Sequence, residues 1–559
     1  MDRRTAISKA LGRQPAQRAA EPPAPQSGFA PHAGPWTFQQ AAHLLRRTTF
    51  GPTYAQIKQA VEDGLEATLD KLFEPLPLPE PPVNPKPHND QVVGVGETWI
   101  NAANPFPVNG MDFIGNRRVS LESWMIGLMW EEGVSIREKL TLFWHNHVPV
   151  SGVLDAKFLY QYIHLLRSQA LGNFRKLIKD VTIAPAMLEY LDGNINEATA
   201  PNENYARELL ELFTIGKKPQ SSPGDYGTFT EQDVWEISRA LTGWRAYGGG
   251  YNNDYPDGDF GAMFTPEDHD TGTKTLSHHF DNQVINNLGE EEYKAVIDII
   301  FEQFEVARFI CRQLYKWFIY YEISEEAEAN VIEPMAQQLW NDDFEIAPAL
   351  RALLGSEHFF DPEYYGTMIK NPVDFMLSAI KPLEMPYSQG LDQKYDAWYR
   401  ISSHMEAMQM SLFFVPEVAG WKAYYREPLY YRHWINATTL PKRSTLMKEL
   451  VYGGIWPFEA NGIPIRVDAL EFIKTIDNPA DPESVVEEFT KILLPKPLSQ
   501  EQYDTLKAIL LDGLPDFEWT VEYGLYAEDP DNSALSEPIK EQLRALLNVI
   551  LSMPEFYLQ

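Results

Sequence analysis

The chain has 559 residues, of which 44% are hydrophobic and 13% aromatic, so it can bury a large core. Its 47 basic residues against 79 acidic ones give a net charge of −32, which argues against nucleic acid or an anionic membrane as a general partner. No run approaches 18 consecutive apolar residues, so no transmembrane segment is predicted, and the single cysteine, Cys311, excludes an intrachain disulfide and cysteine-rich metal centres.

The first 35 residues are predicted to form a disordered tail. Arg3 and Arg4 resemble the start of a twin-arginine export signal, but no apolar stretch of the needed length follows them. Order is expected to begin at Thr37, which with Gln40 has the pattern of a capping box ahead of a helix. Residues 76–110 are a proline-rich excursion that can be neither a helix nor a central strand.

The pattern turns helical from Arg117 onward. Ser135 and Glu138 have the spacing of a capping box for a second helix, which ends in the run WHNHV. His147 lies on the apolar face of that helix and His145 part of a turn away, so only His147 is predicted to point inward. A buried histidine is more often a satisfied core residue than a metal ligand, although two histidines beside an aromatic pair favour a ligand somewhat.

An oxygen-rich loop begins at residue 192 and has the ligand spacing of a calcium-binding loop. The residues at the ligand positions are Asp192, Asn194, Asn196 and Glu203. The sixth position is Glu197 where such a loop needs glycine, so an Asx-rich turn with a helix cap is favoured over a calcium site.

The helix after this loop carries many carboxylates. Glu203, Arg207 and Glu211 follow one another at four-residue steps, which predicts a largely buried ladder with Arg207 between the two glutamates. Glu208 and Glu211 are three residues apart, so a bound cation would relieve their repulsion. The ladder is the favoured interpretation, and Gly216 is placed at the C-terminus of the helix.

A capped helix is predicted from Thr230, with Asp233 as the reciprocal cap, and a long loop follows over residues 245–288. This loop contains His269, His278 and His279, and loops of such length are usually functional or disordered. A later segment rich in methionine and aromatic residues, around Trp421, either lines a cleft or packs in the core.

The predicted fold class is all-α: a large, mainly helical globular core with long irregular loops. Apolar residues recur at three- to four-residue spacing, and no stretch alternates as a large sheet would. Residues 36–450 are expected to form the main helical domain, with a C-terminal helical part, residues 451–559, packed on it.

Seven motifs, in order, resemble the landmarks of a large bacterial family catalogued as domain of unknown function 1800. They are LLRRTTFGPT, REKLTLFWHNHV, PNENYARELLELFTIG, TEQDVWEISRALTGW, HDTGTK, FFVPEVAGW and LLSMPEFYLQ. The resemblance implies a bacterial source, a mainly helical single-domain architecture, frequent twin-arginine export and a partner from a second family, number 1501. The family that the chain resembles, number 1800, has no established activity, so the resemblance supplies no catalytic residues. Because the apolar part of the export signal is lacking, we expect either a cytoplasmic protein or one exported to the periplasm or cell envelope with a partner.

Two classes of function fit these observations. The favoured one is a non-catalytic scaffold or partner subunit with a buried network of histidine, glutamate and arginine. The alternative is a metal-dependent hydrolase or oxidoreductase, in which His147, Glu208, Glu211 and His269 hold zinc, manganese or iron; a b-type haem enzyme also stays open. The candidate cleft residues are His145, His147, Arg207, Glu208, Glu211, His269, Asp270, Lys274 and Trp421.

Overall fold

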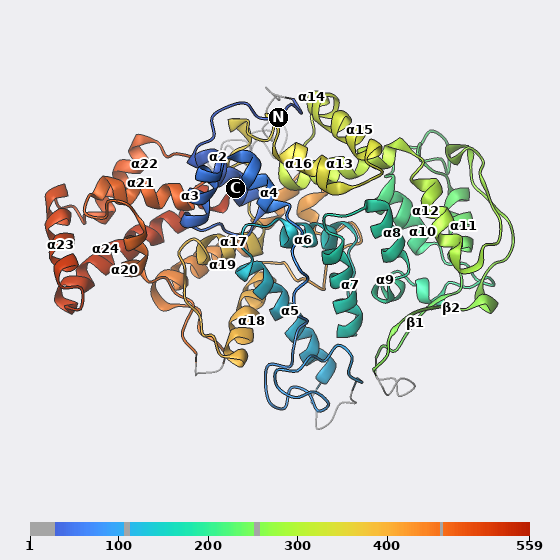
Figure 1. The fold of residues 1–559 in the computed structure, drawn as a ribbon, viewed down its shortest axis with the longest axis horizontal. Coiled ribbons are helices and arrows are strands. Elements are labelled where there is room, and N and C mark those ends of the chain that lie inside the picture. Colours follow the sequence, from blue (N-terminus) through green and yellow to red (C-terminus); the bar gives the residue numbers. More distant parts are fainter. Residues whose placement is uncertain (1–27, 105–111, 251–257, 459–461) are drawn as a thin grey trace, which may run out of the picture.

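The computed structural model describes residues 28–104, 112–250, 258–458 and 462–559 (Figure 1). Helices make up 56% of the chain, and the strands form two small two-stranded sheets. The prediction of a mainly helical protein is therefore confirmed, whereas all-α is too strong. Most of the predicted disordered tail, residues 1–27, lies outside the described residues, as do residues 105–110 of the proline-rich excursion.

The α-helices of the described N-terminal part, with one π-helix, lead to the oxygen-rich loop and beyond it. They are α2 (Phe38–Thr48), α3 (Tyr54–Asp63), α4 (Leu65–Leu72), α5 (Phe113–Glu131), α6 (Arg137–His147), α7 (Ala156–Ser168), α8 (Phe174–Thr182), α9 (Pro185–Tyr190), α10 (Asn204–Glu208), the π-helix η2 (Leu209–Thr214) and α11 (Glu231–Ala240).

The predicted long loop, residues 245–288, holds most of the strand structure, which corrects the expectation of an irregular segment. Strands β1 (Trp244–Tyr247) and β2 (Gly261–Phe264) pair antiparallel, with Trp244 opposite Phe264. Strands β3 (Lys274–Thr275) and β4 (Val284–Ile285) form the second hairpin. Such short hairpins escape prediction because two to four residues show no clear alternation.

Helices resume at residue 292 and continue to the end of the chain. They are α12 (Glu292–Ile300), α13 (Phe304–Phe318), α14 (Glu325–Ala327), α15 (Glu333–Asn341), α16 (Ile346–Leu354), α17 (Pro372–Ile380), α18 (Leu391–Ala407), α19 (Thr439–Lys448), α20 (Ala469–Phe472), α21 (Pro482–Leu493), α22 (Gln500–Leu510), α23 (Asp516–Glu528) and α24 (Ser533–Ser552). None of the helices in the described part of the chain has the length and apolar character needed to cross a membrane.

Local capping signals set several helix starts. Thr37 and Thr230 form the predicted capping boxes of α2 and α11. The box predicted at Ser135 is wrong, because α6 has Ile136 at its N-cap position. Glu138 forms an ion pair with Arg167 on α7 instead. A local sequence pattern cannot indicate such a pair, because its two residues lie on different helices.

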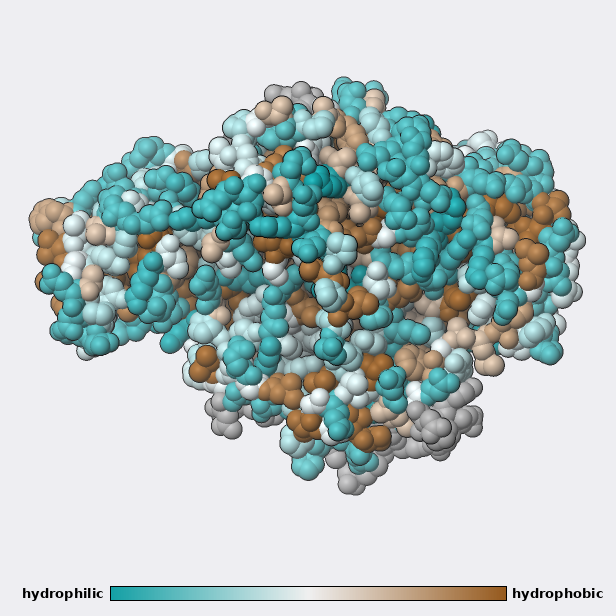
Figure 2. Space-filling view, in the orientation of Figure 1, coloured by the Kyte–Doolittle hydropathy of each residue, from teal (hydrophilic) through white to brown (hydrophobic). Residues whose placement is uncertain are grey.

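Helices α20 to α24 form one end of the molecule, and β1 and β2 lie toward the other (Figure 1). The chain end returns to the middle, where Leu558 bridges Ile369 and Gln559 bonds to Met368. Hydrophilic residues cover much of the face in Figure 2, and apolar residues show at the α23 end. There Phe517, Val521 and Leu525 are all about half exposed, so α23 leaves one face uncovered.

Candidate functional site

Three consecutive polar side chains at the end of α6, His145, Asn146 and His147, each bond to the main chain of a distant segment. His145 Nε2 bonds to the Leu412 carbonyl, Asn146 Oδ1 accepts from the Trp421 N–H at 2.9 Å, and His147 Nε2 lies 3.0 Å from the Phe213 carbonyl. All three residues are buried, which corrects the expectation that only His147 points inward. The end of α6 therefore contacts two parts of the chain that are far from it in sequence, the segment at Phe213 and the stretch from Leu412 to Trp421.

Both histidines are held in their neutral form. Burial lowers the pKa of His145 and of His147 to about 4, and the bonds to carbonyl oxygens oppose that shift only in part. A bond to a carbonyl requires Nε2 to carry a hydrogen, so that nitrogen has no lone pair for a metal ion. His145 Nδ1 has no hydrogen-bond partner among the described residues, and its ring meets Trp421 edge-on.

The predicted residues of the long loop form a separate buried network. His269 Nε2 lies 3.2 Å from the Glu292 carboxylate, which also pairs with Lys274. His269 Nδ1 lies 2.9 Å from the Thr242 carbonyl. Lys274 and Glu292 are fully buried, so their opposite charges offset each other in a dry setting. Asp270 meets Arg239 on α11 through both oxygens. These bonds attach the loop to α11 and α12.

The predicted Glu203–Arg207–Glu211 ladder is wrong in its second half. Arg207 pairs with Glu203 and with Glu231 of α11, each at 2.8 Å, and its side chain is 30% exposed. The helix changes to the wider π-helix at Leu209, which takes Glu211 off the four-residue row. Glu211 pairs with Lys217 instead. Glu208 is half-buried, and burial together with Glu211 raises its pKa.

In the oxygen-rich loop, the four calcium-like side chains accept hydrogen bonds from four different donors. The donors are Asn204 Nδ2 to Asp192, Ala246 N to Asn194, Asn202 N to Asn196 and Arg207 Nη2 to Glu203, at 2.6 to 2.9 Å. The helix cap expected here is not seen, because Glu203 at the N-cap of α10 makes no capping bond through its side chain.

The metal ligands predicted from sequence do not come together. Within the described ranges, the group of three or more histidine, cysteine or acidic side chains whose ligand atoms lie close enough to hold an ion is Asp225, His278 and His279. His147 and His269 bond to unrelated segments. The predicted set of His147, Glu208, Glu211 and His269 is therefore corrected.

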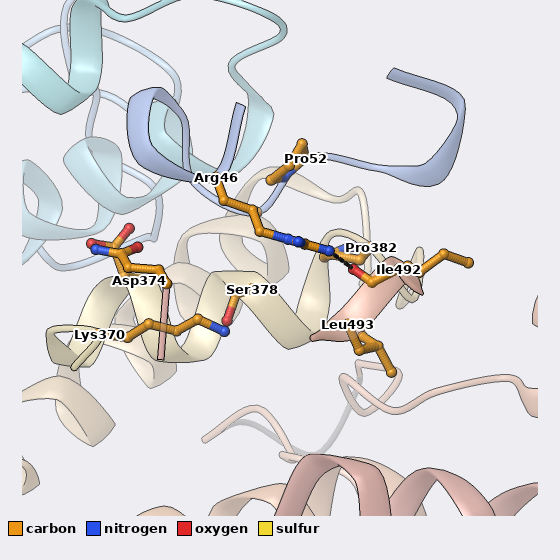
Figure 3. Close-up of a pocket in the computed structure, with 10 residues that line it drawn as sticks. Arg46, Pro52, Lys370, Asp374, Ser378, Pro382, Ile492 and Leu493 are labelled. Carbon is orange, nitrogen blue, oxygen red and sulfur yellow. Dashed lines mark hydrogen bonds between the residues drawn. The ribbon is translucent and has the colours of Figure 1, made fainter. Parts of the chain in front are cut away.

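A cluster of basic side chains, all buried except the partly exposed Arg46, lies where α2, α6, α17 and the chain end meet. Figure 3 shows two of its members, Arg46 and Lys370, beside Asp374. We define the basic cluster as Arg46, Arg47, Lys139, Lys370 and Arg443, with the carboxylate of Asp374 among them. Lys139 pairs with Asp374, whose second oxygen accepts from Asn371 at 2.8 Å. The cluster thus holds more positive than negative charge.

Main-chain carbonyls accept from most of these cations. Arg46 donates to Lys491 and Ile492, Arg47 to Tyr364, Lys370 to Phe556 and Arg443 to Lys370, at 2.6 to 3.0 Å. Burial lowers the pKa of Arg47 and of Arg443 to about 9 and that of Lys370 well below its usual range. Arg443 Nε and Nη1 have no hydrogen-bond partner in the part of the chain that the structure describes.

A cavity beside Arg46, Lys370 and Ser378 has a volume of about 10 Å³, which is room for about one water molecule. The space is therefore too small for an organic substrate. Sequence reasoning missed the whole cluster, because lysine and arginine are rarely buried and its members are spread over nearly 400 residues. The available signal was the pair Arg46-Arg47 at the end of an apolar helix.

The segments that meet around this cluster include several of the motifs that carried the family resemblance. LLRRTTFGPT supplies Arg46 and Arg47, REKLTLFWHNHV supplies Lys139, and LLSMPEFYLQ supplies the carbonyl of Phe556. Neither a curated protein nor a solved structure matches the chain. A family model described as "Protein of unknown function (DUF1800)" matches residues 43–558. Because this match covers nearly the whole chain, the protein belongs to the DUF1800 family.

Proposed function

We propose that the protein is a non-catalytic scaffold or partner subunit. The observation that carries the proposal is the set of bonds at the end of α6, where His145, Asn146 and His147 each bond to the main chain of another segment. Used in this way, the Nε2 atoms of His145 and His147 each carry a hydrogen, so neither Nε2 can act as a base or a metal ligand.

The basic cluster supports the same proposal. Arg46 joins α2 to α21, and Lys370 joins the segment before α17 to the chain end. A buried cation that donates to carbonyls fixes how segments pack, and the cavity beside it admits nothing larger than about one water molecule. A partner from the second family, number 1501, remains an expectation from the resemblance.

The proposal is tested by comparing stability with metal content. Replacing His147 by alanine leaves the buried Phe213 carbonyl without its donor, so we expect a loss of about 1–3 kcal/mol in the free energy of unfolding. The double variant Glu208→Gln, Glu211→Gln should keep the metal content of the wild type, measured by mass spectrometry of metals. A folded double variant that has lost a bound metal would overturn the scaffold proposal in favour of a metal-dependent enzyme.

A further inference from the structure

Two adjacent histidines and one aspartate from separate loops meet at the surface beside α11. Asp225 lies in the turn before α11, and His278 and His279 lie in the short helical turn between β3 and β4. His279 Nε2 is 2.8 Å from Asp225 Oδ1, and His278 Nε2 is 3.7 Å from Asp225 Oδ2. One ligand atom from each side chain lies within 4.8 Å of the other two. Each carboxylate oxygen thus faces a different imidazole.

Neighbouring bonds hold both loops in place. Ser277, the residue before the histidines, donates through its N–H and its hydroxyl to Asp233 on α11, both at 2.6 Å. Asp233 is itself fixed by the capping box with Thr230. On the other loop, the Gly227 N–H donates to Asp225 Oδ1 at 2.9 Å. The three side chains therefore project from a frame that is set before any ligand arrives, which favours binding.

We propose that Asp225, His278 and His279 form a binding site for one divalent transition-metal ion. Two imidazoles and one carboxylate suit zinc, iron, cobalt, nickel or copper, whereas calcium and magnesium prefer oxygen ligands throughout. The centroids of the His278 and His279 rings are 4.1 Å apart, so the two neutral imidazoles can turn toward one ion. Such a site is independent of the scaffold proposal, because none of its residues belongs to the α6 bonds or the basic cluster.

The exposure of the group decides what the ion can do there. The His278 side chain is 64% exposed, while those of His279 and Asp225 are mostly covered. Water can therefore fill the remaining coordination positions on the His278 side. His279 is hydrogen-bonded to Asp225. A bound ion would replace that hydrogen bond and join the loop before α11 to the loop after β3.

The alternative to a metal site is a structural ion pair between His279 and Asp225 at the surface, with no metal bound. The two interpretations differ in what His278 contributes: an ion pair needs one histidine, and a metal site needs both. Zinc binding is therefore measured by titration calorimetry on full-length protein without a histidine tag, stripped of metal beforehand. The variants are His278→Ala, His279→Ala and Asp225→Asn. The matched control is His88→Asn, at an exposed histidine of another segment.

We expect one zinc ion per chain in the wild type and in His88→Asn, with binding at least tenfold weaker in each of the three ligand variants. Cobalt should give a visible absorption spectrum that is lost with His278→Ala. Circular dichroism identifies any variant that fails to fold, and His278→Ala, at the most exposed position, is the decisive one. No saturable zinc binding in the wild type, or equal binding in folded His278→Ala, would overturn the proposal.

Discussion

Two arginines show how strongly burial decides what an ion pair contributes to the free energy of unfolding. Arg207 is 30% exposed, and its partners Glu203 and Glu231 are more exposed still. Arg167 is fully buried and meets both oxygens of buried Glu138, at 2.7 and 2.8 Å. Water screens the first set of charges and is excluded from the second, so the same substitution should have unequal effects.

We expect Arg207→Ala to lower the free energy of unfolding by about 1 kcal/mol or less. Arg167→Ala removes the two-bond partner of buried Glu138, leaves it only the longer contact with Arg137 at 3.6 Å, and should cost about 3–5 kcal/mol. Urea denaturation of the two variants and the wild type at pH 7 measures both values. Equal losses would show that Arg167 is more hydrated than its burial indicates.

For single residues, the sequence indicated which polar side chains matter but not the partners to which they bond. The spacing of Glu203 and Arg207 gave a correct pair, because both lie on one helical turn. The partner of Arg167 lies 29 residues away on another helix, and His145 bonds to a carbonyl 267 residues away. A local pattern carries no information on such distant groups, so the ladder appeared to be the buried network and the real one was missed.

Helix α5 depends on a glycine for its contact with α18. A Cβ atom built on Gly127 would lie 2.6 Å from the indole of Trp398, which is buried in that contact. Helix propensity alone predicts that alanine stabilises an interior helical position by about 1 kcal/mol. Packing predicts the opposite, because the buried indole would have to shift to make room for the added methyl group.

We therefore expect Gly127→Ala to destabilise the protein by about 1–3 kcal/mol. Gly524 on α23 is the matched control, since a Cβ atom there meets nothing within 4 Å. Gly524→Ala should stabilise by about 0.5–1 kcal/mol. Thermal and urea unfolding of the two variants would decide between packing and propensity. Stabilisation by both substitutions would mean that α5 and α18 separate at little cost.

Elements whose signals are local were predicted from sequence. The capping residues Thr37 and Thr230 indicated the starts of α2 and α11, because a cap involves only the next three residues. The π-helix at Leu209 could not be predicted, since its extra residue per turn gives no recognisable pattern of side chains. Glu211 lies within this π-helix and pairs with Lys217 instead of Arg207.

At the scale of the whole molecule, the chain ends and the middle of the sequence share one core. Ala41 near the start, Phe375 in α17 and Phe556 near the end belong to the same buried hydrophobic cluster. Composition predicted such a core, but not that basic side chains would pack against it, as Lys370 does over the Phe556 ring. The order of motifs along the chain does not reveal which of them meet in space.

Buried histidines and buried glutamates make the free energy of unfolding depend on pH in opposite directions. Burial lowers the pKa of His145, His147 and His404 to about 4, so between pH 6.5 and 4 the unfolded chain binds more protons and acid destabilises. Burial raises the pKa of Glu122 to about 7 and that of Glu132, which also faces Glu138, to about 8. Between pH 4.5 and 8 the folded chain keeps these protons, so rising pH destabilises.

Glu132 allows this second effect to be isolated, because the histidines and Glu122 are the same in a Glu132 variant and in the wild type and cancel in the difference. Glutamine resembles the protonated carboxyl, so Glu132→Gln should gain stability relative to the wild type by about 2 kcal/mol when the pH rises from 6 to 8. The control is Glu131→Gln, whose side chain is 42% exposed and should show no such change. Unfolding free energies from urea titrations at both pH values give the comparison. If the difference between Glu132→Gln and the wild type is the same at pH 6 and pH 8, Glu132 is ionised in the folded protein at both, and water or Lys381 must reach its carboxylate.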